Sequence, residues 1–353
     1  MVIGMVMVNP SIETEVISAQ TPAQFEAAVT RAVAMLRAGE VVGLPTETVY
    51  GLAANALDAG AVAKVFAVKG RPAHNPIIVH VAGVAMARRC VTAWPVLADK
   101  LALAFWPGPL TLVLPRSALI PEVVTAGGPT VGIRWPSHPF IQAVIRAGGF
   151  PLAAPSANPA SGLSPTTAEH VRRGLNGRIR LVVDGGASPV GIESTVLDLT
   201  ASPPRVLRPG MIHRASLLAV TGRLQESAGS AAADDLEAGR LRSPGLLRKH
   251  YSPQAKLVVW TWRDAEELKA RIARTPHALS ATHVLAHTRI PDLGGLGRVA
   301  VMAREAAAFA RGLYAELHHC DATGAELIVV EGLPAAAEWQ ALADRLNRAA
   351  AEK

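Results

Sequence analysis

Cysteine and aromatic residues are scarce in this sequence of 353 residues. Its two cysteines, Cys90 and Cys320, stand far apart, and neither belongs to a Cys-x-x-Cys pair. A disulfide framework or a structural zinc site is therefore not expected, because both need several suitably spaced cysteines. Phe, Trp and Tyr together make up 4% of the chain, which leaves few platforms on which nucleic-acid bases could stack.

Long apolar runs and the common catalytic motifs are missing as well. No apolar stretch approaches the ~20 residues that span a bilayer. The apolar start, residues 1–8, has neither the cationic flank nor the cleavage site of a signal peptide. We therefore expect a cytoplasmic protein with no membrane contact. The sequence also has no GxxxxGK[ST], HExxH or GxSxG motif, which disfavours a P-loop ATPase, a zinc protease and an α/β-hydrolase.

The composition predicts two folded domains with an uneven charge. Half of the residues are hydrophobic and 18% are charged, a balance that predicts packed cores rather than general disorder. The net charge of +7 is concentrated at the front: residues 1–215 carry 18 Lys and Arg against 12 Asp and Glu, whereas residues 255–353 carry 12 of each. We expect an anionic ligand, either a small phosphate compound or nucleic acid, to bind to the first part of the chain.

The apolar pattern of residues 15–215 predicts an α/β domain. Apolar residues at helical spacing predict helices over 22–36, 61–68, 85–105, 139–147 and 166–175. Short apolar runs predict strands over 41–44, 76–81, 110–114, 130–134, 151–154, 180–184 and 195–199. Strands of this kind between helices are typical of a twisted sheet covered by helices.

A linker and a smaller domain follow. Residues 216–254 are predicted to be a linker, which ends in an arm over 243–253, SPGLLRKHYSP, stiffened by Pro and Gly. Residues 255–353 predict a small βαβ domain of Rossmann-like type. Its expected strands cover 256–260, 284–287 and 326–330, and its expected helices cover 264–274, 303–319 and 335–350. This domain has no GxGxxG motif, so a dinucleotide site is not expected.

Polar loops follow several predicted strands of the first domain, where open α/β sheets bind ligands. Residues 44–52, LPTETVYGL, gather hydroxyl groups, a carboxylate and a glycine, although a turn that caps a following helix has the same residue types. Residues 153–165, AAPSANPASGLSP, and 185–198, GGASPVGIESTVLD, offer hydroxyl and backbone N–H groups that can hold a phosphate without a P-loop. A capped loop rich in Ser and Pro is the structural alternative for the first of these two.

Cations accompany these loops. Lys69 and Arg71 flank Gly70 at the end of a predicted helix. Such a pair can clamp a phosphate, but cations at the end of a helix also interact favourably with its dipole. Arg134 and Arg208 supply two more cations from other loops. His80 interrupts an apolar strand, a position at which a histidine is more often part of a core than of a catalytic site.

Together these stretches resemble one family, the YrdC-type threonylcarbamoyl-AMP synthases. The resemblance covers residues 23–212 and rests on PTETVYGL, KGRP…NPIIVHV, WPGPLTLVL, VGIRWPSHP, APSANPASGLSPT, GIESTVLDLT and RPG, in the family's order. The linker that ends in HYSP and the domain behind it are similar to the longer, two-domain branch. The resemblance implies a twisted sheet with a wide cationic cleft. It also implies synthesis of L-threonylcarbamoyladenylate and pyrophosphate from L-threonine, bicarbonate or CO₂, and ATP.

The resemblance also implies roles for individual residues. Those expected around the threonine are Thr46, Arg71, His80, Thr111, Ala154 and Ser194. Those expected at the nucleotide are Lys69, Ser156, Asn158, Ser164, Arg208 and Tyr251, with Lys69 and Arg71 as the catalytic cations. Further candidates are Tyr50, Asn75, Arg134 and His250, of which Arg134 could serve only to brace its strand.

The chemistry of the implied reaction fits these residues. ATP carries about four negative charges and the substrate's carbamate and carboxylate add two, so positioning and electrostatics are the main catalytic contributions. Mg²⁺ would be bound mainly through the ATP phosphates. We expect Lys69 and Arg208 to line an exposed cleft, where their replacement leaves the fold intact. The arm is expected to fold back over the cleft, with Tyr251 covering the nucleotide.

The product of this reaction would pass to a separate transferase that modifies tRNA, and the cationic front allows a weak contact with tRNA itself. Two other functions stay open. One is an RNA-binding maturation factor that uses the cationic front as a groove, with steep salt dependence. The other is a carbamoyl transferase of the hydrogenase-maturation type, although the chain lacks the cysteine-rich zinc segments that such proteins need.

Overall fold

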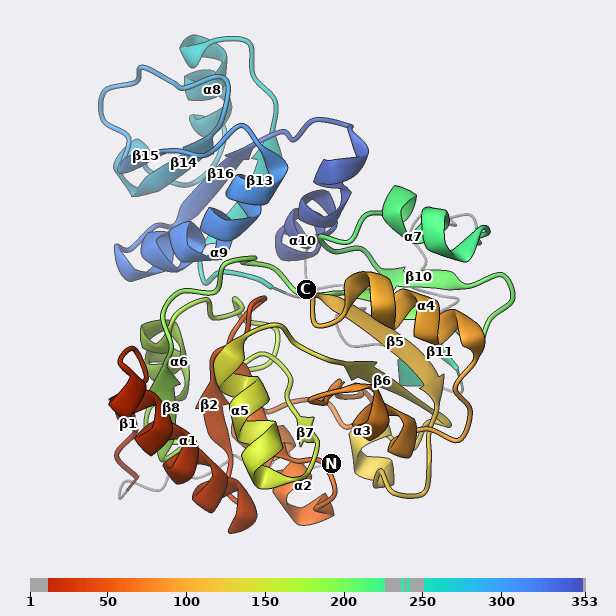
Figure 1. Cartoon of the computed structure of the whole chain (residues 1–353). Helices are drawn as coiled ribbons and strands as arrows, with labels where there is room; N and C mark the ends of the chain where they lie inside the picture. Colours follow the sequence, from red (N-terminus) through yellow and green to blue (C-terminus); the bar gives the residue numbers. More distant parts are fainter. Residues whose placement is uncertain (1–11, 226–235, 238–239, 242–250, 352–353) are drawn as a thin grey trace, which may run out of the picture.

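Two sheets organise the chain in the computed structural model, which describes residues 12–225, 236–237, 240–241 and 251–351. The larger sheet has ten strands in the order β1-β8-β2-β3-β7-β4-β6-β5-β9-β10, and the smaller has four in the order β13-β16-β14-β15. Figure 1 shows the smaller sheet and its helices standing above the larger sheet. A short pair, β11 (Leu236–Glu237) and β12 (Arg240–Leu241), precedes the smaller sheet in the chain.

The larger sheet is mixed: β1 runs parallel to β8, whereas β2 and β3 are antiparallel. Its strands are β1 (Glu15–Ser18), β2 (Val42–Leu44), β3 (Gly51–Asn55), β4 (Val79–His80), β5 (Leu110–Pro115), β6 (Thr130–Arg134), β7 (Leu152–Ala153), β8 (Leu181–Asp184), β9 (Thr195–Asp198) and β10 (Arg205–Arg208). The predicted α/β class is confirmed. The alternative in which residues 44–52 cap a helix is wrong, because the chain reverses there into β3.

Helices cover both faces of this sheet. They are α1 (Pro22–Arg37), α2 (Ala59–Lys69), α3 (Val84–Arg89), α4 (Val96–Phe105), α5 (Pro139–Gly148), α6 (Ala168–Leu175) and α7 (Arg214–Thr221). Apolar residues of α1 and α5 share one core with the sheet, and those of α2, α4 and α6 share another. The single helix predicted over 85–105 is wrong: α3 ends before Cys90, Val91 pairs with Arg116, and α4 begins only after Pro95.

The second domain is a parallel sheet between helices. Its strands are β13 (Lys256–Trp260), β14 (Thr282–Ala286), β15 (Arg298–Val301) and β16 (Leu327–Glu331), and its helices are α8 (Ala265–Ile272), α9 (Ala306–Ala322) and α10 (Gln340–Ala350). Its 3₁₀ turns lie at Leu279–Ala281 and Ala337–Trp339, and the first domain has one at Glu122–Thr125. Helices α9 and α10 pack on one face and α8 on the other. The predicted βαβ character is confirmed.

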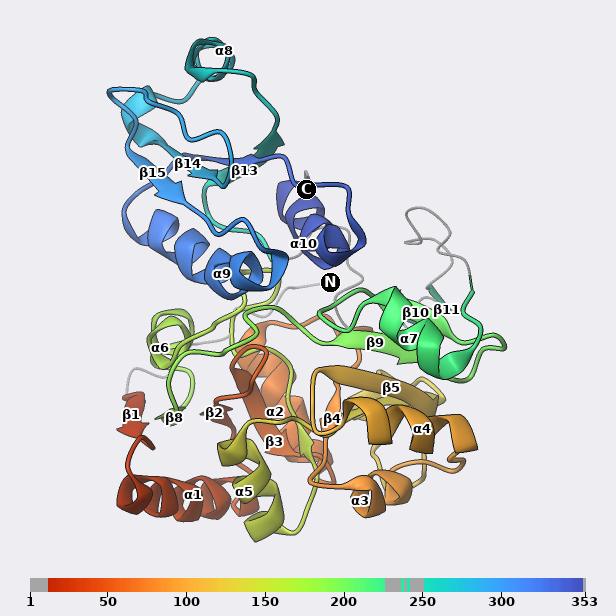
Figure 2. The same cartoon turned by 45° about the horizontal axis from the view of Figure 1, so that its top comes forward.

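One apolar core joins the two domains. Val49, Leu163 and Ile192 of the first domain are buried in the same cluster as residues of α9 and α10. Each such side chain contributes about 1.5–3 kcal/mol by leaving water. Figure 2 shows α9 lying directly over loops of the first domain. At Gly191, whose φ is +86°, an added Cβ would lie 2.4 Å from the backbone oxygen of Ala310 in α9. The domains are therefore packed backbone against backbone at this point.

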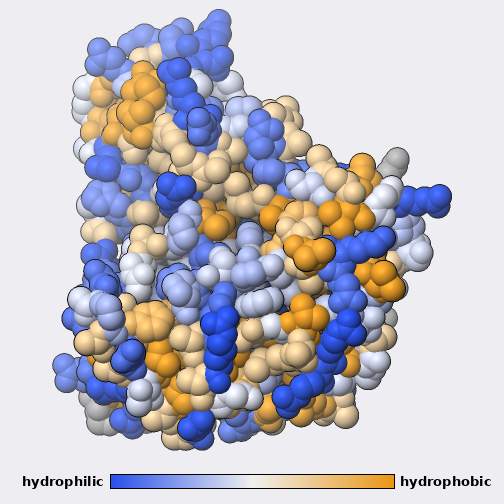
Figure 3. Space-filling model, in the orientation of Figure 1, coloured by the Kyte–Doolittle hydropathy of each residue, from blue (hydrophilic) through white to orange (hydrophobic). Residues whose placement is uncertain are grey.

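The surface is mixed in polarity. In the face drawn in Figure 3, apolar atoms gather over α4 and α7, where Val96, Leu103 and Leu218 are 73%, 90% and 43% exposed. Both cysteines, Cys90 and Cys320, are free and buried. Among the described residues, no helix is both long enough and apolar enough to cross a membrane.

Replacing Gly191 by alanine should weaken the docking of the two domains. The methyl group must displace the backbone of α9, and alanine adopts a positive φ at a cost of roughly 1–2 kcal/mol, so we expect a loss of about 3 kcal/mol in the free energy of unfolding. Urea denaturation measures this loss. Gly222→Ala is the matched control, since its φ is +71° with open space around it, and it should lose only about 1 kcal/mol. Equal losses in the two variants would contradict this account of the interface.

Candidate active site

A cavity of about 50 Å³ lies where loops after several strands of the larger sheet meet Tyr251 of the arm. Ten residues predicted for the site line it: Thr46, Tyr50, Arg71, His80, Arg134, Ala154, Ser156, Ser194, Arg208 and Tyr251. These residues come from segments spread over 206 positions of the chain, and the fold brings them to one place. Thr48, Ile78 and Glu193 also line the cavity, although the sequence analysis did not select them.

Besides Lys69, four predicted residues lie behind this lining rather than in it. The Thr111 hydroxyl is 2.8 Å from that of Ser194. The Ser164 hydroxyl donates to Glu193 Oε1 at 2.5 Å. Asn75 accepts from Arg71 through both its carbonyl and its side-chain oxygen, and Asn158 belongs to the loop that Lys69 holds. Each of these residues therefore contacts the wall of the cavity. His250 lies outside the described residues.

Lys69 is buried, with 3% of its surface exposed. It ends α2, and its ammonium group reaches across to donate to the carbonyl oxygens of Ser156 and Asn158 at 2.6 and 2.5 Å. Burial, followed by the charge of Arg71, lowers the pKa of Lys69 well below its ordinary value. The expectation of an exposed cleft cation is therefore wrong for Lys69, because its buried amino group donates to carbonyl oxygens of the loop that carries Ser156.

Two guanidinium groups face the cavity from different loops. Arg71 donates to Asn75 and to the Pro76 carbonyl oxygen, and Arg208 donates to the Ser194 carbonyl at 3.0 Å. Burial is the main cause that lowers the pKa of Arg71 to about 9; Tyr251 raises it and Arg208 lowers it further. Arg208 is only 4% exposed, so exposure was wrongly expected for it too. Both groups stay cationic at neutral pH and are placed to meet an anion.

Arg134 is paired within the wall. Its guanidinium lies 2.6 Å from the Glu47 carboxylate and donates to the Thr48 hydroxyl at 2.9 Å. Burial raises the pKa of Glu47, but Arg134 outweighs it and leaves that pKa below its ordinary value. Near this pair, burial and the Arg134 charge lower the pKa of His80 to about 3. The bracing role that the sequence allowed for Arg134 is the one its contacts support, and His80 is a neutral imidazole at pH 7.

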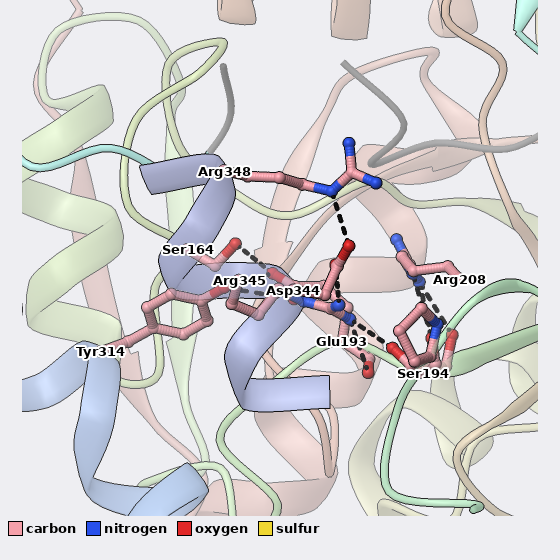
Figure 4. A network of polar contacts seen from close by, with 9 residues as sticks. Ser164, Glu193, Ser194, Arg208, Tyr314, Asp344, Arg345 and Arg348 are labelled. Atoms are coloured by element: carbon pink, nitrogen blue, oxygen red, sulfur yellow. Dashed lines mark hydrogen bonds and ion pairs between the residues drawn. The ribbon is translucent and has the colours of Figure 1, made fainter. Parts of the chain in front are cut away.

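Glu193 is held by side chains from both domains (Figure 4). Arg345 of α10 donates to its Oε2 at 2.7 Å, and the Tyr314 hydroxyl of α9 lies 3.2 Å from the same oxygen. Ser164 approaches Oε1 from the first domain. Burial raises the pKa of Glu193, but Arg345 and then Arg208 lower it, so that its pKa lies below the ordinary value. The buried carboxylate is therefore ionised and satisfied.

Arg345 joins several segments of the site. It is 1% exposed, and besides Glu193 it donates to the Pro209 carbonyl at 3.0 Å. Its guanidinium carbon lies 5.2 Å from the ring centroid of Tyr251, a cation–π distance. No sequence signal marked Arg345, because it occupies one position of an amphipathic helix that also carries Arg348.

The comparisons with known proteins agree with this arrangement. A family model described as telomere recombination matches residues 34–210, and one described as threonylcarbamoyl-AMP synthase, C-terminal domain, matches residues 211–351. The threonylcarbamoyl-AMP synthase of Pyrococcus abyssi is 37% identical over 90% of this chain and 92% of its own length. That of Bacillus subtilis is 39% identical over 91% and 92%.

The chain belongs to the threonylcarbamoyl-AMP synthase family. Its two domains place it in the longer branch of that family, as the resemblance predicted. The crystal structure of P. abyssi Sua5 complexed with L-threonine has a TM-score of 0.85 to this chain at 36% identity, covering 96% of this chain and 98% of the other. The predicted limits of the catalytic domain, the linker and the second domain, 15–215, 216–254 and 255–353, stay a prediction. The first family model ends at residue 210 and the second begins at residue 211.

Lys69→Met tests the role of the buried ammonium. The variant leaves the carbonyl oxygens of Ser156 and Asn158 without their donor, so we expect a loss of roughly 2–4 kcal/mol in the free energy of unfolding. Lys64→Met is the matched control on the same helix, since the Lys64 side chain is 47% exposed and pairs with Glu40 at the surface; it should change stability by about 0.5 kcal/mol or less. A Lys69→Met protein as stable as the control would contradict the holding role.

Proposed function

We propose that this chain makes L-threonylcarbamoyladenylate and pyrophosphate from L-threonine, bicarbonate or CO₂, and ATP. The observation that carries the proposal is the composition of the cavity. Neutral hydrogen-bonding groups of Thr46, His80 and Ser194 lie on the same wall as the cations Arg71 and Arg208. Such a site suits a substrate with a small polar end and a phosphate-bearing end.

The neutral groups would hold the threonine. The Thr46 hydroxyl donates to the Val49 carbonyl at 2.6 Å and accepts the backbone N–H groups of Thr48 and Val49, so it shapes the turn of the wall that the amino acid would contact. The Thr111 and Ser194 hydroxyls share one hydrogen bond, so together they can still donate one proton and accept others. His80 adds a ring that carries no charge at pH 7. These groups can bind an amino acid without competing for the phosphates.

The cations would hold the phosphates and the carbamate. The threonine amine first takes up CO₂ to form a carbamate and releases a proton. A carbamate oxygen then attacks the α-phosphorus of ATP, the bond from that phosphorus to the bridging oxygen breaks, and pyrophosphate leaves with the electron pair. Arg71 and Arg208 would neutralise charge and keep the reacting groups in line. Ser156 and Ser194 would act as hydrogen-bonding groups, since this reaction needs no protein nucleophile.

The residues of the cavity fit a Mg²⁺ ion that is held mainly by the nucleotide. Among the described residues, no group of three His, Cys, Asp or Glu side chains could hold a metal. Glu193, which lines the cavity, and Glu47, which stands between the lining residues Thr46 and Thr48, are committed to Arg345 and Arg134. Bound with ATP, the ion would neutralise phosphate charge.

Tyr251 would control access of the nucleotide. The cavity of about 50 Å³ is far smaller than the roughly 300–1,000 Å³ of ligand pockets. Tyr251 is 1% exposed and lines it, so ATP could bind only after this part of the arm had moved. Its return would exclude water from the carbamate. The product would then pass to a separate tRNA-modifying transferase in the cytoplasm.

Pyrophosphate release tests the proposal directly. Purified protein with Mg²⁺ and ATP should release pyrophosphate only when L-threonine and bicarbonate are both present. Serine should react more slowly, because it lacks a methyl group whose burial is worth about 0.8 kcal/mol, or roughly fourfold. Release at the same rate without threonine would contradict the synthase assignment.

A further inference from the structure

A second cavity lies between the domains, on the other side of the loop that carries Ser156. It has a volume of about 350 Å³, which is within the range of small-molecule pockets. Its walls come from α6 and the loop over residues 158–163 of the first domain, from the end of α9, and from Ser252 and Gln254 of the arm. Figures 1 and 2 both show α9 next to α6 here. The proposed synthase reaction makes no use of this cavity.

Two histidines on its wall have complementary unused nitrogens. His170 and His318 stack across the domain interface with ring centroids 4.0 Å apart and planes inclined by 17°. The backbone N–H of Thr166 donates to His170 Nδ1 at 3.3 Å, so the proton of that neutral ring is on Nε2. His318 Nε2 faces the Ser164 carbonyl oxygen at 3.1 Å, which can only accept, so its Nδ1 is an acceptor.

These contacts leave one donor on His170 and one acceptor on His318, on two rings that are stacked. No described residue is a hydrogen-bond partner of His170 Nε2 or His318 Nδ1, and neither atom is a buried unsatisfied group, so both are accessible. Burial is the main cause that lowers the pKa of His170 to about 3 and that of His318 to about 4. The pair therefore presents a neutral edge at pH 7.

The charges around the cavity favour a neutral ligand group over a phosphate. Arg173 is paired with Glu169 at 2.9 Å. Asp321 accepts the backbone N–H groups of Gln254 and Ala255 and keeps its carboxylate at the wall. The rest of the lining is mostly small or apolar, as at Pro159 and Leu163. An anion would meet a carboxylate here with no uncommitted cation among the described lining residues.

We propose that this interdomain cavity binds a nucleobase, whose edge pairs with His170 Nε2–H and His318 Nδ1. Every nucleobase carries an acceptor beside an N–H donor, as adenine does with N1 and its amino group. A small carboxamide has the same edge but leaves most of the cavity empty. The base belongs either to a free nucleoside or nucleotide or to a single strand of RNA.

A base bound here lies behind the wall that carries Tyr251. The backbone N–H of Ser252 donates to the Ser161 carbonyl at 3.0 Å, and Ser252 pairs with Gly162. Tyr251 faces the catalytic cavity, whereas Ser252 faces the second one. The occupant would therefore contact the segment whose movement admits ATP.

Titration calorimetry with the full chain tests the proposal. Excess threonine and one equivalent of a non-hydrolysable ATP analogue first fill the catalytic cavity, so that no free analogue competes for the second one, and adenosine, guanosine, cytidine or uridine is then added. We expect one equivalent of at least one nucleoside to bind. If it is adenosine, purine riboside, which lacks the amino group, should bind roughly fivefold more weakly or worse. No binding by any of the four nucleosides, or equal binding of adenosine and purine riboside, would overturn the proposal.

A variant locates the site. His170→Phe keeps a ring to stack on His318 but removes the Nε2–H donor, so nucleoside affinity should fall roughly fivefold or more. Arg172→Gln is the control, because Arg172 is on the same helix and pairs with Glu169 outside the cavity. Unchanged affinity in His170→Phe would overturn the assignment. If that variant does not fold, histidine ring ¹⁵N spectra of the unaltered protein decide instead: both accessible nitrogens should shift on nucleoside binding, and unshifted signals would refute it.

A third measurement, the affinity for a short oligonucleotide, identifies the source of the base. A hexanucleotide of the same base that binds more tightly than the nucleoside assigns the site to single-stranded RNA; equal or weaker binding assigns it to a free nucleoside or nucleotide. Both results support a nucleobase site. Because the readout is binding to protein whose catalytic cavity is already filled, the result does not depend on whether pyrophosphate is formed.

Discussion

The buried carboxylate of Glu193 sets requirements on both domains. An ionised carboxylate removed from water costs several kcal/mol unless it is paired and hydrogen-bonded. The first domain supplies the Ser164 hydroxyl and the charge of Arg208, while Arg345 and Tyr314 of the second domain supply the stronger charge and a further donor. Docking of the second domain therefore offsets much of the free-energy cost of burying the ionised Glu193 carboxylate.

The same contacts hold the wall of the candidate active site. Ser194 follows Glu193 directly and is bonded to Arg208 and Thr111. Arg345 reaches the Pro209 carbonyl, one residue after Arg208, and lies over the Tyr251 ring. The second domain thus supports the loops that line the cavity, although the cavity's lining comes from residues 46–208 and Tyr251. A domain without a dinucleotide motif thus has a physical role in supporting the cavity's wall.

The sequence predicted the components of the site better than their contacts. Loops placed after apolar strands were correctly expected to converge, because strand ends of an open sheet meet at one edge. Helices with clear apolar periodicity, such as α1 and α9, were found close to their predicted limits. Strand β3 was missed because its small residues, GLAAN, carry no strand signal, and β10 because Arg occupies both its ends.

Long-range contacts had no local signal. The pairing of Glu193 with Arg345 joins residues 152 positions apart, and nothing at either position marks it. Lys69 was predicted to face the nucleotide, but its burial against carbonyl groups depends on the path of a loop almost ninety residues away. Local pattern cannot distinguish a cation that faces a ligand from one that holds the loop beside it.

A double-mutant cycle on Glu193 and Arg345 tests the central claim most directly. Glu193→Gln, Arg345→Met and the double variant are compared for the free energy of unfolding and for the affinity for L-threonine. If the pair couples the second domain to the site, each single variant loses about 3–5 kcal/mol of stability, threonine binding weakens in both, and the double variant is little worse than either single one. Additive losses, or threonine affinity unchanged in Arg345→Met, would contradict the account.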